Sequence, residues 1–165
     1  MRLYLLRNAK TIPGKKDARR ELSSNGIQSL EKLAVFLNNK ELIEVDEIRH
    51  SPLVRARQTA SHFKTFTGIK AKTREVPLLD PFADFRILAD ILESSGENLL
   101  LVGHQPNLSM LASYLLTKES KPDLFKLKRA GLLCLEKADD SEPDDDWDAS
   151  WQLRWMIDPQ LLKKK

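Results

Sequence analysis

Two uninterrupted apolar runs, at residues 3–6 and 99–102, constrain the fold of this chain more than any other feature. Each run is too short to be a helix, and neither alternates apolar with polar residues, so both predict strands that are covered on both faces. Each run is followed by polar residues and then by a turn that leads to a segment with helical spacing. This alternation predicts an α/β fold, a three-layer sandwich with a mostly parallel central sheet and helices on both faces.

The remaining elements follow from the same reading of periodicity and of turn and cap residues. Ser23 or Ser24 is expected to cap a helix that ends at residues 38–39. Ser51 is expected to cap a second helix that begins at Pro52, and Pro106 is expected to open another one. Further strands are predicted at residues 44–50, 131–136 and 151–157, and a further helix at 85–92. The last two strands should form a C-terminal antiparallel pair.

Length and composition limit the classes of protein that the chain can represent. Its 165 residues, 41% of them hydrophobic and 31% charged, predict one soluble globular domain over residues 1–165. The formal charge of +3 does not indicate a nucleic-acid partner, and without a run of eighteen apolar residues no membrane span is expected. Cys134, the only cysteine, lies among leucines and predicts a buried thiol; a reducing, cytoplasmic location is expected.

Polar residues that could hold an anion stand at three junctions between a strand and a helix. Arg7 and Asn8 follow the first strand, Arg55 lies in the first turn of the helix after residue 51, and His104 follows the strand at 99–102. In sheets of this type, ligands bind beyond the carboxyl ends of the strands. Two arginines and a histidine around one crevice suit a doubly charged phosphoryl group. Each residue taken singly could equally be a solvated or structural side chain.

The order of these motifs resembles that of the histidine phosphatase superfamily, and most of all its SixA-type phosphohistidine phosphatases. The matching segments are Arg7-Asn8-Ala9, Leu22-Ser-Ser-Asn-Gly26, Ser51-Pro-x-x-Arg55-Ala-x-Gln-Thr59 and Val102-Gly-His-x-Pro106. Later Lys-Arg-Ala-Gly and Trp-x-Leu-Arg-Trp stretches look similar too, so the resemblance spans nearly the whole chain. It implies a phosphoglycerate-mutase-like fold.

The resemblance also implies a site and a reaction. Arg7, Arg55 and His104 would bind the phosphoryl group, and the residue at position 8 would attack phosphorus and carry it as phosphohistidine. Asp17 and Asp80 are the candidate proton donors. The expected substrate is protein phosphohistidine, and the expected partner is therefore a phosphorylated protein with a phosphohistidine domain, in signal transduction. No cofactor and no metal are implied.

Position 8 departs from the family pattern, which has histidine where this chain has Asn8. A neutral imidazole has a free in-plane lone pair, whereas the lone pair of an amide nitrogen is delocalised into its carbonyl. Asn8 can still donate a hydrogen bond to a phosphate oxygen. The expectation is a chain that binds phosphate but is inactive or impaired.

Three alternatives remain open at this point. The chain could be a pseudophosphatase that binds phosphorylated protein without turnover, or a small-molecule phosphomonoesterase of the same superfamily. In a third, His50, beside the second junction, would replace the missing nucleophile.

Overall fold

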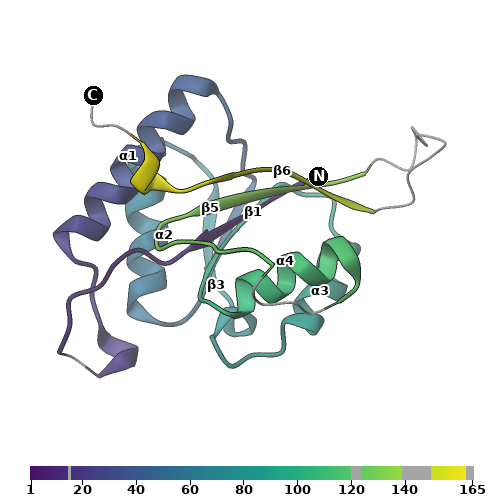
Figure 1. Cartoon of the computed structure of the whole chain (residues 1–165), viewed down its shortest axis with the longest axis horizontal. Helices are drawn as coiled ribbons and strands as arrows, with labels where there is room; N and C mark the ends of the chain where they lie inside the picture. Colours follow the sequence, from purple (N-terminus) through teal and green to yellow (C-terminus); the bar gives the residue numbers. More distant parts are fainter. Residues whose placement is uncertain (15, 120–123, 139–149, 163–165) are drawn as a thin grey trace.

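The structure, a computed structural model, describes residues 1–14, 16–119, 124–138 and 150–162. Within these residues, six strands form one mixed sheet in the spatial order β3-β2-β4-β1-β5-β6 (Figure 1). The first four strands of this order are parallel, whereas β5 is antiparallel to β1 and β6 is antiparallel to β5. The strands are β1 (Arg2–Arg7), β2 (Glu47–His50), β3 (Lys72–Glu75), β4 (Leu99–Gly103), β5 (Leu132–Lys137) and β6 (Trp151–Ile157). The predicted mostly parallel sheet with a C-terminal antiparallel pair is confirmed.

Helices cover both faces of the sheet and complete the predicted three layers (Figure 1). Successive side chains of a strand point to opposite faces, so in β1 Leu3 and Leu5 pack in one apolar core, and Tyr4 and Leu6 in the other. The first core also contains α3 (Phe85–Glu93) and α4 (Asn107–Thr117), and the second contains α1 (Ser24–Lys40) and α2 (Val54–Thr67). None of the helices in the described part of the chain is long and apolar enough to cross a membrane.

The helix starts agree only in part with the predictions. Ser23 caps α1 as expected, and its hydroxyl accepts a hydrogen bond from the backbone N–H of Gly26 at 3.1 Å. The predicted cap Ser51 is wrong, because α2 begins at Val54 and has no side-chain cap. Pro106 likewise stands one residue before α4. A Ser-Pro pair fits a turn as well as a helix start, and the hydroxyl of Ser51 is used elsewhere, as described below.

The edge strand β3 was not predicted from the sequence. All four of its residues are exposed, so it lacks the apolar pattern by which strands are recognised. Its parallel pairing with β2 comes from backbone hydrogen bonds at the sheet edge. Charged residues on an edge strand also hinder pairing with another chain.

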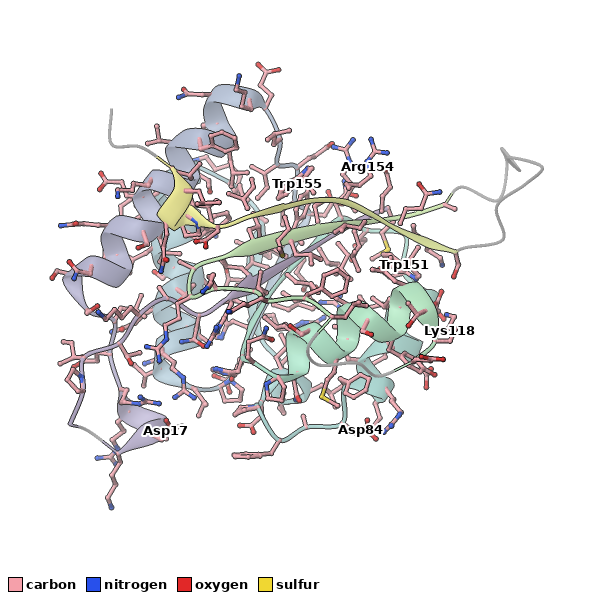
Figure 2. The ribbon with its side chains drawn as sticks, in the orientation of Figure 1. Asp17, Asp84, Lys118, Trp151, Arg154 and Trp155 are labelled. Carbon is pink, nitrogen blue, oxygen red and sulfur yellow. The ribbon has the colours of Figure 1, made fainter. Side chains whose placement is uncertain are left out.

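A β-bulge in β6 places its two tryptophans in different cores. Trp151 and Trp155 are four residues apart and would share one face of a regular strand. Leu153 and Trp155 pair with the consecutive residues Leu135 and Cys134, so Arg154 is an extra residue that reverses the alternation. Trp151 packs with the α3 and α4 side, whereas Trp155 lies on the side of α1 and α2, as Figure 2 shows.

Candidate active site

Three parallel strands end side by side and bring the predicted site residues together. β1 and β2 both pair with β4, so their carboxyl ends lie at the same edge of the sheet. The contact continues one residue past each strand: the N–H of Asn8 donates to the carbonyl of Gly103 at 2.9 Å, and the N–H of Ser51 donates to the carbonyl of Val102 at 3.0 Å. His104 follows Gly103 and therefore lies between Asn8 and Ser51.

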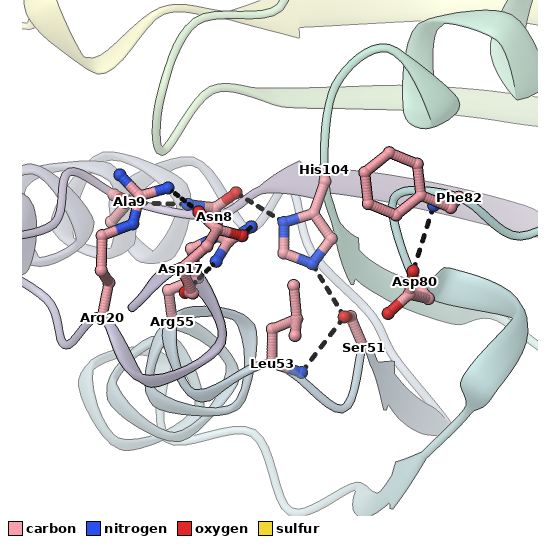
Figure 3. Close-up of polar contacts among 10 residues, drawn as sticks. All are labelled: Asn8, Ala9, Asp17, Arg20, Ser51, Leu53, Arg55, Asp80, Phe82 and His104. Carbon is pink, nitrogen blue, oxygen red and sulfur yellow. Dashed lines mark hydrogen bonds and ion pairs between the residues drawn. The ribbon is translucent and has the colours of Figure 1, made fainter. Parts of the chain in front are cut away.

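A directed chain of hydrogen bonds joins these three side chains (Figure 3). Nδ1 of His104 lies 3.0 Å from Oδ1 of Asn8, and Nε2 lies 2.7 Å from Oγ of Ser51. An amide oxygen only accepts, so Nδ1 carries the proton and donates it to Asn8. In neutral imidazole Nε2 then accepts from the hydroxyl of Ser51, whose oxygen in turn accepts from the backbone N–H of Leu53 at 3.3 Å. Nδ2 of Asn8 donates to the carbonyl of Ala9 at 3.1 Å.

His104 is neutral at physiological pH. The pKa of His104 is lowered from 6.5 to about 4, chiefly by burial and next by the charge of Arg55, against opposing contributions from the charges of Asp80 and Asp17. Only 3% of the residue is exposed. The Nδ1 proton of this neutral ring is donated to Asn8, and a phosphoryl oxygen could accept it by taking the place of the amide oxygen.

We expect His104 to make the folded chain less stable in acid. Above pH 6.5 His104 is neutral in both states and has no effect. Between pH 6.5 and about 4 the unfolded chain binds a proton that the folded chain does not, so the free energy of unfolding falls by up to ~3 kcal/mol. Urea unfolding across this range should show a smaller fall for His104→Gln than for the unaltered chain. His62→Gln serves as the control, and equal pH dependence in all three proteins would contradict the assignment.

Arg55, the second predicted phosphoryl ligand, is held by the carboxylate and the backbone carbonyl of Asp17. Nη2 of Arg55 lies 3.1 Å from Oδ2 of Asp17, and its Nη1 donates to the backbone carbonyl of Asp17 at 2.8 Å. The other oxygen of Asp17 accepts a hydrogen bond from Arg20. These contacts bring the segment around Asp17–Arg19 (η1) over the site, and Arg55 remains only 7% exposed.

Asp17 is therefore poorly suited to the predicted role of proton donor. Partial burial raises the pKa of Asp17, but hydrogen bonds and charges from Arg20 and Arg55 outweigh it and lower the pKa below its usual value. An ionised carboxylate has no proton to give near neutral pH. In this arrangement Asp17 occupies the guanidinium of Arg55 as an anionic ligand would.

We expect Asp17→Asn to tighten the binding of inorganic phosphate or tungstate by a few fold. The substitution removes a carboxylate that competes for Arg55, but Asp17 is largely exposed, so solvent weakens the competition. Titration by calorimetry measures the change. Asp90→Asn, at an exposed position on α3, makes the same change in net charge and should have no effect. Unchanged or weaker binding in Asp17→Asn would show that this carboxylate does not compete for the site.

Arg7 and Asp80 complete the set of predicted residues. Nη1 of Arg7 donates to the carbonyl of Leu127 at 2.8 Å, and burial lowers the pKa of Arg7, with a smaller contribution from the charge of Arg129. Asp80 accepts a hydrogen bond from the backbone N–H of Phe82. The charges of both Arg7 and Asp80 act on His104, so the other five residues proposed from the sequence lie around the ring of His104. Their roles remain predictions.

Other residues of the quoted motifs hold the segment between Ala9 and Leu22 in place. Thr59 accepts from the N–H of Ala9 at 3.1 Å, and Gln58 accepts from the N–H of Leu22 at 2.8 Å. A Cβ atom at Gly26 would lie 2.3 Å from the carbonyl oxygen of Lys10, so only glycine allows α1 to approach the chain just after Asn8 this closely. These residues position the site without belonging to it.

Ser51 is a site residue that the sequence reasoning missed, because it was assigned to a helix cap. It is fully buried, and its hydroxyl donates to Nε2 of His104, while Asn8 accepts the proton on Nδ1. No local signal distinguishes this role, because Ser-Pro at the start of a helical segment is also the usual pattern of a cap. The contact of Ser51 with His104 is seen only once the end of β4 is placed beside the end of β2.

We expect Ser51→Ala to remove a hydrogen bond from His104 and to destabilise the folded chain. Nε2 of His104 would lose its buried donor, at a cost to stability of about 1–2 kcal/mol. Nitrogen-15 NMR should then show a shifted Nε2 signal, because that nitrogen no longer accepts a hydrogen bond, while Nδ1 keeps the proton that it donates to Asn8. Ser109→Ala, at another buried serine, should leave the His104 signals unchanged. An unchanged Nε2 signal in Ser51→Ala would contradict a positioning role for Ser51.

His50 does not lie where a substitute nucleophile would have to be. Its Nδ1 lies 2.9 Å from the carbonyl oxygen of Ser51, to which it donates, and its ring lines a separate surface cavity of about 430 Å³. That cavity lies between α2 and β3 and is also lined by Arg57, Lys64 and Lys70. None of Arg7, Asn8, Arg55 and His104 lines it. The rescue by His50 therefore has no support from the geometry.

Two further chemical possibilities can be assessed for the described residues. Within residues 1–14, 16–119, 124–138 and 150–162, no group of three or more His, Cys, Asp or Glu side chains could hold a metal ion. Cys134 is buried, and burial raises the pKa of its thiol to about 12, so this cysteine is unsuited to nucleophilic chemistry.

Comparisons with known proteins agree with the motifs. Residues 3–76 match the family model of the histidine phosphatase superfamily (branch 1). A search of curated protein sequences found no match. Among solved structures, the protein histidine phosphatase SixA in complex with tungstate is similar with a TM-score of 0.83 and 21% identity, over 99% of this chain and 100% of that one.

Two other similar structures are named for different substrates. The α-ribazole phosphatase from Shigella flexneri has a TM-score of 0.71 at 17% identity and covers 96% of this chain and 97% of its own. A mutant (H9A) of phosphoserine phosphatase from Entamoeba histolytica, in complex with phosphoserine, has a TM-score of 0.64 at 17% identity, with 96% and 98% covered. At these identities the likeness shows a shared fold. The resemblance predicted from the motifs is thus confirmed: residues 3–76 match the histidine phosphatase superfamily, and the fold is that of the SixA phosphohistidine phosphatases.

Proposed function

We propose that this chain is a phosphatase scaffold of the SixA type, whose site is built to take the phosphoryl group of protein phosphohistidine. Asn8 makes the present chain inactive or nearly so. The family match over residues 3–76 and the similarity to SixA support the phosphatase class. A phosphorylated protein is proposed as partner, in a cytoplasmic signalling role.

The observation that carries the proposal is the contact between Asn8 and His104. Side chains at these two positions are 3.0 Å apart and buried, with two arginines close enough to influence the ring. A histidine at position 8 would stand beside a neutral imidazole that presents its Nδ1 proton. Such a pair suits attack on phosphorus by one ring while the other donates to a phosphoryl oxygen.

The expected reaction has two steps in the variant Asn8→His. The introduced imidazole attacks phosphorus and the P–N bond to the substrate histidine breaks, with the departing nitrogen taking up a proton. Water then attacks the phosphorylated side chain and releases inorganic phosphate. The imidazole of a phosphohistidine leaves phosphorus more readily than an alkoxide does, so a site without a strong proton donor is adequate.

A second candidate function, binding without turnover, is favoured by the polar character of Asn8 itself. Nδ2 of Asn8 could exchange its bond to the Ala9 carbonyl for one to a phosphate oxygen. A histidine-to-alanine mutant of the similar phosphoserine phosphatase holds phosphoserine. The unaltered chain would then protect a phosphorylated protein rather than hydrolyse it.

A substrate panel tests these possibilities. The variant Asn8→His is incubated with a histidine-phosphorylated protein, with phosphoserine and with p-nitrophenyl phosphate, and phosphate release is measured for each. The proposal expects the phosphohistidine protein to be hydrolysed most efficiently. Preference for a phosphate ester would instead indicate the small-molecule phosphomonoesterase. Tight binding of the phosphorylated protein without turnover by either variant would indicate the pseudophosphatase.

A further inference from the structure

Phe82 is the most exposed large apolar side chain among the described residues. Its accessible fraction is 95%, whereas Phe85 and Phe63 are 5% and 0% exposed. A single exposed apolar residue carries little meaning alone, since many proteins have some. Phe82 is informative because its backbone is held in place and because it lies beside the candidate active site.

Hydrogen bonds fix the backbone of the turn on both sides of Phe82. The N–H of Phe82 donates to Oδ1 of Asp80 at 3.1 Å, and the N–H of Ala83 donates to the carbonyl of Asp80 at the same distance. Nδ2 of Asn107, the first residue of α4, donates to the carbonyls of both Asp80 and Ala83, at 3.0 and 2.9 Å. Phe82 is thus held outward from a fixed backbone, and an aromatic anchor of this kind loses little conformational freedom on binding.

This turn borders the candidate active site. The carbonyl oxygen of Leu79 would lie 3.6 Å from a Cβ atom at Gly103, directly before His104. The charge of Asp80 acts on the ring of His104. Figure 3 shows Asp80 and Phe82 beside that ring, on the side away from Arg55. Phe82 therefore stands at the rim, on a side that the cationic ligands do not occupy.

Several cationic residues lie in or near the site, one of them, Arg55, paired with the carboxylate of Asp17. Arg7 and Arg55 lie in the site, and the charge of Arg129 is close enough to lower the pKa of Arg7. Lys10, two residues after Asn8, is exposed. This charge suits a phosphoryl dianion and an acidic surface around it. A small phosphorylated ligand would be held by the arginines alone, whereas Phe82 could contact only a ligand that extends beyond the site.

We propose that Phe82 anchors a folded, phosphorylated protein. An apolar surface patch of that protein takes the ring of Phe82 while its phosphohistidine enters the space between Arg7, Arg55 and His104. The inference rests on the proposed function and adds to it the residue that would hold the surface of the partner protein.

Binding and turnover test the anchor separately. The probe is a folded protein domain phosphorylated on a single surface histidine with potassium phosphoramidate, and the small reference ligand is phosphohistidine itself. Affinity for the domain is measured by calorimetry with the unaltered chain, which retains Asn8. We expect Phe82→Ala to weaken binding of the phosphorylated domain by about tenfold or more, the size typical of an interface anchor. Tungstate binding should not change.

Two control variants separate an anchor from a general loss of apolar surface. Leu161→Ala removes another exposed side chain, 81% accessible, in the turn Pro159–Leu161 (η3), which packs near α1 on the other side of the sheet. It should bind the phosphorylated domain normally. Phe82→Trp keeps an aromatic ring and should retain most of the affinity.

Turnover adds a second readout in the Asn8→His background. Phe82→Ala should raise KM for the phosphorylated domain and leave the hydrolysis of phosphohistidine unchanged. Equal affinity of Phe82→Ala and the unaltered chain for the domain, no binding of the domain at all, or an equal loss with phosphohistidine would each overturn the anchor. Failure of the proposed function looks different, because Asn8→His would then release no phosphate from any of these substrates.

Discussion

Replacing Asn8 with histidine is expected to raise the rate of phosphate release from a histidine-phosphorylated protein by roughly 10⁴- to 10⁶-fold, the range seen when a catalytic nucleophile is lost or regained. The amide of Asn8 cannot attack phosphorus, because its nitrogen lone pair is delocalised, whereas an imidazole at the same position can. The position is prepared for this exchange: Asn8 is 9% exposed and lies in hydrogen-bond contact with His104.

The measurement is a single-turnover assay with phosphorus-32 on the substrate histidine. The variant Asn8→His should carry label transiently, in a bond that is stable in base and labile in acid, as expected for a phosphorylated imidazole. Asn8→Ala and Asn8→Gln are the matched controls and should remain as inactive as the unaltered chain. Turnover by the unaltered chain at the rate of Asn8→His would show that this reaction does not begin at position 8.

The second large effect is expected from Arg55. Its guanidinium makes two contacts with Asp17, one to the carboxylate and one to the backbone carbonyl, so both donors already point into the same space. A phosphate or tungstate ion that displaces this carboxylate gains charge-assisted hydrogen bonds worth about 1.5–3 kcal/mol each. Arg55→Ala should therefore weaken tungstate binding by roughly 100-fold or more, given about 1.4 kcal/mol for each factor of ten.

Arg57→Ala is the matched control for this experiment. It lies on the same helix two residues later, is exposed, and lines the separate cavity behind His50. It removes the same charge and should leave tungstate affinity within a factor of about two, the long-range share of a screened surface charge. Urea unfolding of both variants establishes that each remains folded. Equal losses of affinity in the two variants would mean that the ion responds to net charge and not to the two guanidinium donors of Arg55.

Much of the fold was predictable because it depends on local patterns. The strands β1 and β4 were recognised from uninterrupted apolar runs, and α1 from its spacing and its Ser23 cap. The edge strand β3 was missed because pairing with β2, and not any burial of its own side chains, defines it. The bulge at Arg154 was equally invisible, since it is a mismatch in length between two strands.

The candidate site was likewise predictable only in part. The residue types at three strand ends predicted a phosphoryl site at Arg7, Arg55 and His104, because parallel strands end at a common edge. The partners of those residues could not be predicted. Asp17 appeared as a proton donor, but its carboxylate is paired with Arg55 and Arg20. Ser51 appeared as a helix cap, but its hydroxyl lies 2.7 Å from His104.

By itself, therefore, the sequence determined which strands are buried, which residues stand at their ends, and that position 8 holds an amide where a nucleophile is expected. Each of these is a property of neighbouring residues and of their chemistry. The tertiary structure alone decided the order of the strands, and with it that Asn8, Ser51 and His104 form one hydrogen-bonded chain. Contacts between residues 53 and 96 positions apart depend on how whole layers pack, which no local pattern encodes, and the proton on Nδ1 of His104 is set by the longer of the two.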